Sequence, residues 1–438
     1  KELHKLKISD EKIDELLHSL LALHPKRIKT KIDLSLDRTI KLLNKLGNPQ
    51  KKLKGVIYVC GTNGKFSTLN FIREILKYNN KKTNNYISPH LVRFNERFTI
   101  LDRVINNDDL YELLSYIKEV NGDDEITFFE ITSSAFFKIA SDHNEADYNI
   151  VEAGLGARAD STAPIDPEIS VISSISMDHM EYLGNTIEQI AADKARAIRT
   201  NKMAIIGYQP FKEAQEVLLD YAKEVGAPTW LYDFNYFIYK DGDKLVYEDN
   251  DNRIKFQSFN HLPEFQIKNL GLAIASVLNL YNIDARSYLL NNHHQNAYFP
   301  GRFEKLENGK LNQLLSSNNE LYLEGGHNVD AAIAVNESLK ELPKKQLVLI
   351  LGMISSKNPA KYIREFKNVE RIYTITIPNE ESSITAKQLK ELIKEEHTNV
   401  KASDSLETAL VEIGEKYPDS RACITGSLYL CGYVLRVN

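Results

Sequence analysis

A chain of 438 residues is long enough for two or three domains, each able to bury a core of its own. Its hydrophobic content of 42% and charged content of 26% are ordinary for a globular protein, and a net charge of -5 without a long basic block argues against nucleic acid as the main partner. The sequence shows no secretory core segment and no apolar run of about 18 residues, which argues against a membrane span. We therefore expect a cytoplasmic monomer.

Short β-branched runs, each followed by a Gly-containing turn and a helical pattern, recur along the chain. The candidate strands are 55–60, 148–153, 169–174, 203–207, 321–324, 346–351, 371–377 and 421–425. Strands this short and apolar, separated by helix-length segments, predict an α/β fold with parallel sheets covered by helices on both faces. Ligands in such folds bind at the carboxyl ends of the strands. The polar segment 232–258 is predicted to be a hairpin or surface excursion rather than core, and the polar stretch 291–297 to be a domain boundary.

The first predicted strand leads into a glycine-rich turn, which is followed by a helical pattern. A glycine turn at a helix N-terminus points backbone N–H groups at an anion, and the helix dipole adds roughly half a positive charge. Lys65 would reach the outer phosphates of a nucleotide, and Ser67 would ligate magnesium. Because Phe66 separates these two residues and the first glycine of the full phosphate-loop signature is missing, a tight turn capped by a serine stays an alternative. The turn comprises Gly61, Thr62, Asn63, Gly64, Lys65, Phe66, Ser67 and Thr68.

This turn resembles the nucleotide loop of the Mur-ligase superfamily, and the segment ISPHLVRFNER at 87–97 is similar to the branch of the folylpolyglutamate and dihydrofolate synthases. The resemblance covers nearly the whole chain and rests on several separate motifs. It implies an ATP-binding phosphate-loop domain at 1–296, which includes a pterin-binding N-terminal segment, and a smaller Rossmann-like α/β domain at 297–438. It also implies ATP and two Mg²⁺ ions as cofactors, with K⁺ as a further candidate. Its nucleotide contacts in this turn are Gly61, Thr62, Asn63, Gly64, Lys65, Ser67 and Thr68.

A carboxylate and an imidazole follow two of the predicted strands. Glu152 ends the strand at 148–153, and His179 comes soon after the strand at 169–174, so both belong to the ligand edge of the sheet. A hard cation that bridges phosphates prefers oxygen ligands. The pattern alone favours His179 as a hydrogen-bonded loop histidine. The resemblance implies that Ser67 binds a first magnesium ion, while the second is bound by Ser88, Glu152 and His179.

Lys194 lies on the apolar stripe of a predicted helix that Thr186 and Gln189 should begin as a capping box. A buried ammonium is costly, so this side chain must snorkel to solvent, find a partner or change its chemistry. The pattern alone favours snorkelling. The resemblance implies instead that Lys194 carries a carbamate (N6-carboxylysine), an anion that would support the second magnesium ion.

Four residues later in the chain extend the resemblance, and three of them lie in the second domain. Asn269 matches an asparagine that contacts the nucleotide in the family, and the Arg302 guanidinium is suited to phosphate. Glu324 and His327 follow a predicted strand and match residues that face the nucleotide and the acyl phosphate. Seen alone, such an arginine or histidine is more often a surface residue. The resemblance implies a nucleotide enclosed between closing domains, with Lys65, Lys194 and His327 as the catalytic residues.

The pterin site is less visible in the sequence. The matching places are Ile32, Asp33, Leu34, Thr127, Phe129 and Asp160. An aromatic ring for stacking and a carboxylate for N–H donors suit a pterin, although plain core packing explains Phe129 equally well. We expect ATP-dependent addition of L-glutamate to dihydropteroate and to tetrahydrofolates through an acyl phosphate.

Departures from the family pattern leave other functions open. Phe66, Ala157 and Arg196 stand where the family has glycine, Glu324 where it has aspartate, and Phe265 where it has histidine. A folylpolyglutamate synthase restricted to one substrate and a non-catalytic nucleotide-binding module are the alternatives. A peptidoglycan-precursor ligase would need a domain of roughly 100 residues ahead of the loop, on the scale of small domains. Only 60 residues precede Gly61, which disfavours that ligase.

Overall fold

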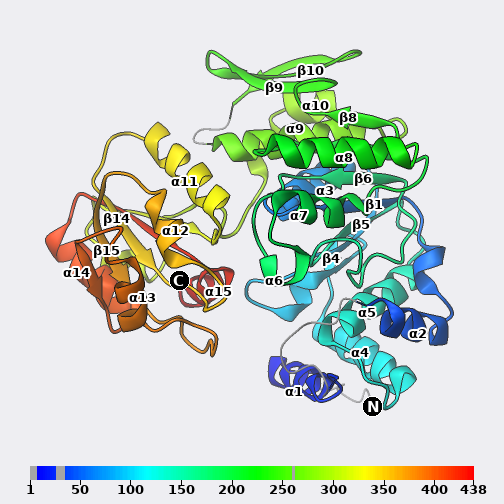
Figure 1. Cartoon of the computed structure of the whole chain (residues 1–438), viewed down its shortest axis with the longest axis horizontal. Helices are drawn as coiled ribbons and strands as arrows, with labels where there is room; N and C mark the ends of the chain where they lie inside the picture. The colour runs from blue at the N-terminus through cyan, green and yellow to red at the C-terminus, as the bar shows by residue number, and fades with distance from the viewer. Residues whose placement is uncertain (1–6, 26–34, 259–261) are drawn as a thin grey trace, which may run out of the picture. The chain divides into compact units, whose positions relative to one another are not determined.

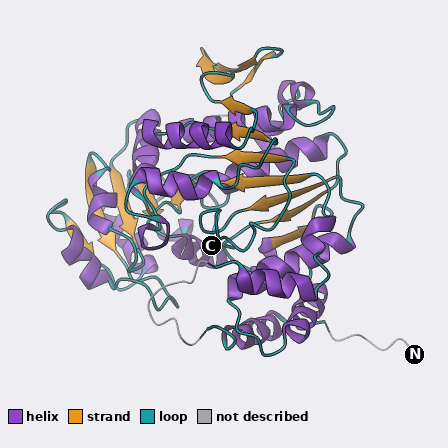
Figure 2. Ribbon diagram, turned by 45° about the vertical axis from the view of Figure 1, so that its right-hand side comes forward, coloured by secondary structure: helices purple, strands orange, loops and turns teal. Residues whose placement is uncertain are grey.

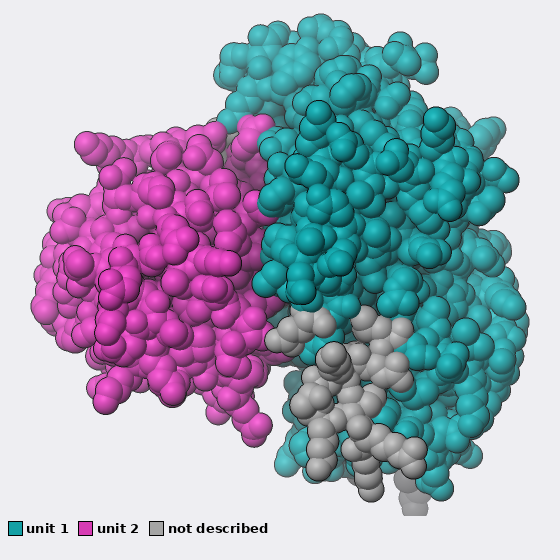
Figure 3. All heavy atoms as spheres, in the orientation of Figure 1, with its two compact units in different colours: residues 1–259, 266–297 teal, residues 260–265, 298–438 magenta. Residues whose placement is uncertain are grey.

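The computed structural model describes residues 7–25, 35–258 and 262–438. The chain divides into two compact units, one formed by residues 1–259 and 266–297 and the other by residues 260–265 and 298–438 (Figure 3). None of the helices in the described part of the chain combines the length and the apolar character needed to cross a lipid bilayer. Three predicted pterin contacts, Ile32, Asp33 and Leu34, lie outside the described residues.

An eight-stranded sheet forms the centre of the first unit. The strands β2, β5, β1, β6, β7 and β8 are parallel, while β3 and β4 pair antiparallel at one edge. Because β1 and β6 are buried along their whole length, they fit a sheet that is covered on both faces. The order across the sheet is β4 (Arg103–Val104), β3 (Phe98–Ile100), β2 (Thr83–Tyr86), β5 (Tyr148–Glu152), β1 (Val56–Cys60), β6 (Ile169–Ile172), β7 (Met203–Ile206) and β8 (Thr229–Leu231).

The register of the central strands brings three carboxyl ends to one place. Val59 of β1 is paired with Glu152 of β5, and Cys60 of β1 is paired with Ile172 of β6. The turns that follow β5, β1 and β6 are therefore neighbours. This is the edge at which parallel sheets bind ligands.

Helices cover both faces of this sheet (Figures 1 and 2). Their buried faces follow helical spacing, as in α4, where Leu110, Leu113, Leu114 and Ile117 are buried. The helices are α1 (Asp10–Leu21), α2 (Asp37–Lys45), α3 (Lys65–Tyr78), α4 (Asn107–Asn121), α5 (Phe128–Asp142), α6 (Met180–Leu183), α7 (Ile187–Ala195), α8 (Lys212–Glu224), from Gln266 on α9 (Glu264–Leu278), and α10 (Ala285–Leu290). Short 3₁₀ turns are η1 (Pro49–Lys52), η2 (Phe94–Arg97) and η3 (His293–Asn296).

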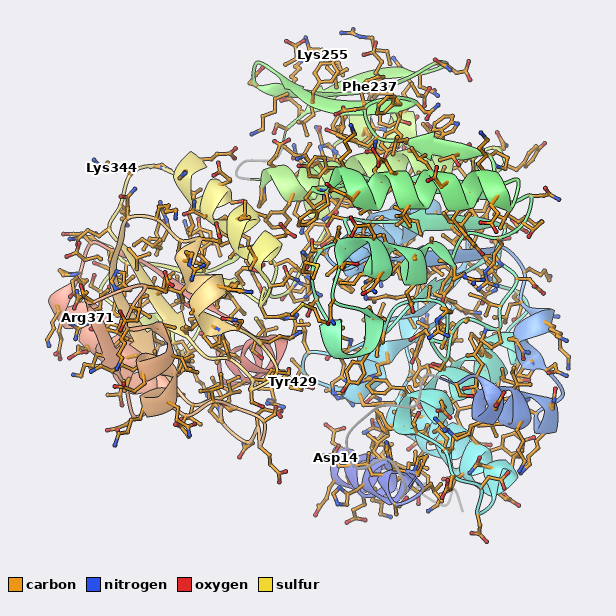
Figure 4. The ribbon with its side chains drawn as sticks, in the orientation of Figure 1. Asp14, Phe237, Lys255, Lys344, Arg371 and Tyr429 are labelled. Atoms are coloured by element: carbon orange, nitrogen blue, oxygen red, sulfur yellow. The ribbon has the colours of Figure 1, made fainter. Side chains whose placement is uncertain are left out.

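The segment predicted to be a hairpin or surface excursion is a three-stranded antiparallel sheet with a packed face. Its strands are β9 (Tyr236–Asp241), β10 (Lys244–Asp249) and β11 (Arg253–Gln257). Along β9, Tyr236 and Ile238 are buried while Phe237 is exposed, and Phe237 and Lys255 are visible on this sheet in Figure 4. The Tyr236 hydroxyl donates to the carbonyl of Ile206 at 3.0 Å. The predicted hairpin is therefore confirmed by the antiparallel pairing of β9 with β10, whereas the exclusion of this segment from the core was wrong, because its polar residues alternate with buried aromatic and aliphatic ones.

The second unit is built around a six-stranded sheet. All its strands are parallel except β12, which pairs antiparallel at one edge. The order is β12 (Glu304–Leu306), β13 (Glu320–Glu324), β17 (Arg421–Thr425), β14 (Leu347–Leu351), β15 (Val369–Thr374) and β16 (Val400–Ala402). Its helices are η4 (Asn312–Leu314), α11 (Val329–Glu341), α12 (Pro359–Arg364), α13 (Ala386–Ile393), α14 (Leu406–Lys416) and α15 (Leu428–Val437). The predicted α/β class is confirmed, and each of the eight predicted strands overlaps an observed one.

Candidate active site

The phosphate loop connects β1 to α3 at the centre of the first sheet. The N–H groups of Thr62 and Asn63 donate to the carbonyl of Ser174 at 2.8 and 3.2 Å, which fastens the loop to the end of β6. Gly61 has a φ of 146°, and a Cβ there would overlap the side chain of Ser173. The loop therefore needs glycine at its first position because the neighbouring strand end lies directly against it.

Helix α3 begins at Lys65, directly after the loop. Gly64 precedes it in a left-handed conformation with a φ of 88° and supplies no side-chain cap. The first helical N–H groups of such an end are oriented toward the loop. Phe66 is half-buried in the first turn, and the N–H of Thr68 donates to the Gly64 carbonyl at 3.0 Å. The substitution of phenylalanine for the family's glycine thus leaves the helix start in place.

Lys65 and Glu152 lie at the same edge of the sheet. The Lys65 ammonium donates to the carbonyl of Ala153 at 3.0 Å, with the Gly154 carbonyl at 3.5 Å. Ala153 directly follows Glu152, whose carboxylate is only 4% exposed. The backbone N–H of Ser88 donates to this carboxylate at 3.4 Å. The loop lysine, the strand carboxylate and Ser88 therefore belong to one cluster.

The residues predicted to hold magnesium are a carboxylate, two hydroxyls and an imidazole. Glu152, Ser67 and Ser88 are buried oxygen donors, which suit a hard cation. His179 is exposed, has a φ of 51° and precedes α6, and its N–H donates to Asp178 Oδ1 at 2.9 Å. Within the described ranges no cluster of three or more His, Cys, Asp or Glu residues could hold a metal ion. The donor set fits magnesium through its oxygens, with His179 on the turn after the neighbouring strand.

Lys194 in α7 lies beneath the phosphate loop. Its side chain is 3% exposed, and its ammonium donates to the carbonyl of Gly61 at 2.8 Å. Burial lowers the pKa of Lys194 to about 8, and the nearby charge of Lys65 acts in the same direction. The prediction from the pattern alone, that Lys194 snorkels to solvent, is wrong. The ammonium stays buried because the backbone carbonyl of Gly61 accepts a hydrogen bond from it.

The helix that carries Lys194 begins as predicted, with one change in its cap. Thr186 Oγ1 accepts a hydrogen bond from the N–H of Gln189 at 3.2 Å. The Gln189 side chain accepts from the N–H of Asn185 at 2.8 Å, one residue earlier than a capping box requires. Further along α7, Asp193 accepts from the N–H of Ala157 at 2.9 Å. This contact ties the turn after β5 to the helix.

Two residues of α9 complete the surroundings of the loop. A Cβ on Gly64 would overlap the side-chain amide of Asn269. Asn269 Nδ2 donates to Gln266 Oε1 at 2.9 Å, and Gln266 Nε2 donates to the Ser67 hydroxyl at 3.0 Å. Asn269 was predicted to contact nucleotide, whereas Gln266 was missed. The spacing of three residues, which places both amides on one helix face, was the available signal.

The described residues of the predicted pterin site lie around the start of α5. Thr127 caps this helix, and its side chain accepts from the N–H of Glu130 at 3.2 Å. Phe129 is 52% exposed, so its alternative assignment to the core was wrong. The Arg97 guanidinium lies 5.9 Å from the Phe129 ring centroid and is itself 5% exposed, a contact that the sequence analysis missed. Phe129 thus offers a ring face beside a buried cation.

Asp160 lies on the turn after β5 and is held by its own surroundings. One of its oxygens accepts from the N–H of Leu155 at 2.9 Å, and the other accepts from the N–H of Thr162 at 3.0 Å and from the Thr162 hydroxyl. A Cβ on Gly154 would come within 3.2 Å of Asp160 and 3.4 Å of Ser88 Oγ. Asp160 therefore shapes the same turn that presents Ala153 to Lys65.

In the second unit, the predicted residues gather around the end of β13. Glu324 is 5% exposed, and its carboxylate accepts from the N–H of Gly326 at 2.7 Å. Burial raises the pKa of Glu324 to about 7, against the opposing charge of Arg302. Arg302 donates to the carbonyl of Pro300 at 3.0 Å. His327 is half-buried and directly precedes the cap of α11, so this unit presents a carboxyl, a guanidinium and an imidazole on neighbouring turns.

A glycine loop that joins a central parallel strand to a helix, with a lysine and a buried carboxylate beside it, is typical of a nucleotide-dependent enzyme. The family model of the Mur ligase middle domain matches residues 59–285, and that of the dihydrofolate synthetase C-terminal domain matches residues 307–437. The chain therefore belongs to the Mur ligase family, in the branch of the folylpolyglutamate and dihydrofolate synthases, and is an ATP-dependent ligase.

Relatives and solved structures match over nearly the full length. The folylpolyglutamate synthase of Lacticaseibacillus casei is 28% identical over 91% of this chain and 92% of its own length. The dihydrofolate synthase/folylpolyglutamate synthase of Escherichia coli is 29% identical over 93% and 92%. The structure of E. coli FolC in complex with DHPP and ADP has a TM-score of 0.82 and 25% identity, with 96% of this chain and 97% of that chain covered.

Proposed function

We propose that this chain is a magnesium-dependent ligase that adds L-glutamate to dihydropteroate and to reduced folates through an acyl phosphate. Residues 1–296 would form the ATP-binding domain and residues 297–438 the second domain. The nucleotide contacts, metal ligands and catalytic residues that the sequence predicts are part of this proposal. Their support is the clustering described above, together with the names of the relatives.

One observation carries the proposal. The Lys65 ammonium, which would reach an outer phosphate in this proposal, donates to the carbonyl of the residue after Glu152, a buried carboxylate. Triphosphate and metal would thus be held at the same sheet edge. Phosphoryl transfer requires this arrangement, since its catalysis consists largely of positioning and charge stabilisation.

The chemistry follows from the poor reactivity of a carboxylate. A carboxylate oxygen is a poor leaving group, so an oxygen of the substrate carboxylate first attacks the γ-phosphorus of ATP. The bond from this phosphorus to the bridging oxygen breaks and ADP leaves, while the Lys65 ammonium would stabilise the charge on the transferred group. The amino nitrogen of glutamate then attacks the acyl carbon, the C–O bond to phosphate breaks, and the amine loses a proton. His327 is our candidate to assist this attack. Two magnesium ions, one held by Ser67 and one by Ser88, Glu152 and His179, would neutralise charge on the triphosphate.

Lys194 is our candidate for carbamylation. Only a neutral amine adds to carbon dioxide, and the lowered pKa of about 8 makes that form more accessible than for an exposed lysine. The amine nitrogen bonds to the carbon of carbon dioxide and releases one proton. The product, an anionic carbamate, keeps one N–H that can still donate to the Gly61 carbonyl. The carbamate would place a negative charge in these buried surroundings. Because a cation is attracted to that charge, the modified Lys194 would support the second magnesium ion. A K⁺ ion is a further candidate for this region.

The exposed ring of Phe129 supports the assignment of a pterin. A pterin is a flat, conjugated ring, and offset stacking on an aromatic face is favourable. Thr127 caps the helix that carries Phe129, and Ser161, the neighbour of Asp160, donates to the Phe129 carbonyl at 3.3 Å. Both Thr127 and Asp160 already serve local hydrogen bonds. We also propose that the protein is a cytoplasmic monomer, a location supported by three free, buried cysteines.

Product analysis tests this proposal. Purified protein is incubated with ATP, Mg²⁺ and L-glutamate and with either dihydropteroate or tetrahydrofolate, and the products are analysed by mass spectrometry. We expect a mass increase of one glutamate residue with each acceptor. Product from only one acceptor would restrict the substrate range. ATP binding without phosphate release under any of these mixtures would support a non-catalytic module instead.

A further inference from the structure

We propose that Gln266 is a positioning residue for the hydroxyl of Ser67 and thereby sets the affinity of the phosphate-loop metal site. This inference rests on the proposed function, because it concerns the magnesium ion that Ser67 would hold. It adds a residue that the sequence analysis did not assign. Gln266 touches neither nucleotide nor metal in this role and acts through Ser67 alone.

The contact between the two side chains is fully buried. Gln266 is 1% exposed and Ser67 is 2% exposed, and Gln266 Nε2 lies 3.0 Å from Ser67 Oγ. They come from different helices, α9 and α3, and are 199 positions apart in the chain. A buried polar amide without a partner is unfavourable, so the folded protein keeps this contact formed.

Asn269 engages the end of the Gln266 amide that is turned away from the serine. Asn269 Nδ2 donates to Gln266 Oε1 at 2.9 Å, so the carbonyl end of Gln266 is occupied and its NH₂ end is turned to Ser67. Asn269 is itself confined, since its amide lies where a Cβ on Gly64 would be. The phosphate loop, Asn269, Gln266 and Ser67 thus form a closed chain of contacts.

This orientation determines what the hydroxyl can offer. A serine hydroxyl has one proton to donate and two acceptor positions. Because Gln266 donates into one acceptor position, the Ser67 proton cannot point toward Gln266 and stays available for a phosphate oxygen. The remaining acceptor position is free to meet a cation. A ligand that is oriented in advance in this way binds its metal more tightly than one that must reorient.

Metal binding in a set of variants tests this role without any turnover. The affinity for Mn²⁺, a stand-in for Mg²⁺, is measured by electron paramagnetic resonance of the free ion in the presence of a non-hydrolysable ATP analogue. We expect Gln266→Met, which keeps the length of the side chain but removes its amide, to weaken Mn²⁺ binding about 10- to 100-fold. Affinity for the same analogue in EDTA should change far less.

A second pair of variants separates positioning from packing. In a Ser67→Ala background, the further change Gln266→Met should alter Mn²⁺ affinity by no more than about two-fold, because the hydroxyl that it positions is gone. Gln50→Met is the matched control, since Gln50 is also buried at 4% exposure and donates to Asn48 at 3.4 Å, outside the loop. Gln266→Asn, which retains an amide that is too short to reach Ser67, replaces Gln266→Met if the latter does not fold.

Three results would overturn the proposal. The first is an unchanged Mn²⁺ affinity in Gln266→Met, and the second is a full additional loss in the double variant. The third is an equal loss of analogue affinity in EDTA, which would indicate a structural role. Because these measurements need neither folate nor glutamate, they stand apart from product formation by the wild-type protein, on which the proposed function depends.

Discussion

Two turns of this protein share a strand, glycine turn and helix, yet they satisfy the helix N-terminus differently. After β1, Gly64 precedes α3 and provides no side-chain cap. After β13, Asn328 caps α11 by accepting from the N–H of Ala331 at 2.9 Å, and Glu324 accepts from the N–H of Gly326. The first turn is therefore suited to receive an anion, whereas the second uses its own side chains as acceptors. The same local theme thus yields a phosphate loop in one unit and a platform for side chains in the other.

Lys65→Ala removes the charge of the first turn and should have the largest effect. We expect kcat to fall about 10²- to 10³-fold, as for loss of a donor that stabilises a transition state. The rate of phosphate release in the presence of all substrates measures it. Lys344→Ala, which changes an exposed lysine of the second unit (Figure 4), should leave the rate unaltered. Equal rates of phosphate release by Lys65→Ala and the wild type would mean that the lysine of the first turn takes no part in the reaction.

Lys194→Ala deletes the side chain that supports the first turn from below. We expect a loss of activity of about 10²-fold, at the upper end for residues that support a metal site. Short-chain carboxylates added to the assay should restore part of the rate if the missing group is an anion. Cys60→Ala, a change in the same buried region, should remain active. Full activity of Lys194→Ala would contradict the proposed carbamate.

Glu324→Gln changes the carboxyl of the second turn and should affect stability in a pH-dependent way. The pKa of Glu324 is raised from 4.5 to about 7 in the folded protein. Between pH 4.5 and pH 7 the folded protein therefore keeps a proton on this carboxyl that the unfolded protein has lost. Its stabilising contribution is present below pH 4.5 and is lost as the pH rises through 7. Relative to Glu324→Gln, the wild type should therefore lose about 2 kcal/mol of unfolding free energy between pH 5 and pH 8. The unfolding free energies of both proteins are measured by urea unfolding at each pH. If they changed in parallel with pH, burial would not raise the pKa of Glu324.

Gly64→Ala tests whether the first turn depends on glycine for space. The new Cβ would overlap the amide of Asn269, and overpacking of this kind typically costs ~1–3 kcal/mol, so we expect about 10-fold weaker ATP binding by calorimetry. Gly242→Ala is the matched control, because Gly242 has a φ of 64° but no atom within 4 Å of an added Cβ. If both variants bound ATP equally well, the close approach of Asn269 to Gly64 would be irrelevant to ATP binding by the loop.

Asn328→Ala removes the cap of the second turn and should have the smallest effect. Loss of an N-cap side chain costs about 1 kcal/mol of stability. Thermal unfolding should show this loss without a change in ATP affinity if the α11 N-terminus is not an anion site. A marked fall in ATP affinity would instead mean that both turns hold phosphate.

Much of the fold could be predicted because the central strands are short, apolar and followed by glycine turns. The phosphate loop and the position of Glu152 follow from the same pattern, since the end of a parallel strand defines the ligand edge. The packed face of the small sheet of β9 to β11 was missed, although a hairpin was expected there, because Asp, Asn and Lys dominate its composition and conceal the alternation of buried residues such as Tyr236 and Ile238.

Contacts between distant segments were harder to predict. The sequence places Lys194 on an apolar stripe but does not reveal that the carbonyl of Gly61 lies opposite it. The contact of Gln266 with Ser67 depends on how α9 packs beside α3, which neither segment determines alone. Likewise, the exposure of Phe129 depends on the surrounding turns rather than on the helix that carries it.

Isotope transfer from the substrate carboxylate tests the central claim most directly. If the folate-type acceptor is labelled with oxygen-18 in the carboxylate that receives glutamate, an acyl phosphate requires the phosphate released to carry one labelled oxygen. The label is read by mass spectrometry or by the shift of the phosphorus resonance. Labelled phosphate is the predicted result, and amide product accompanied by unlabelled phosphate would contradict the account.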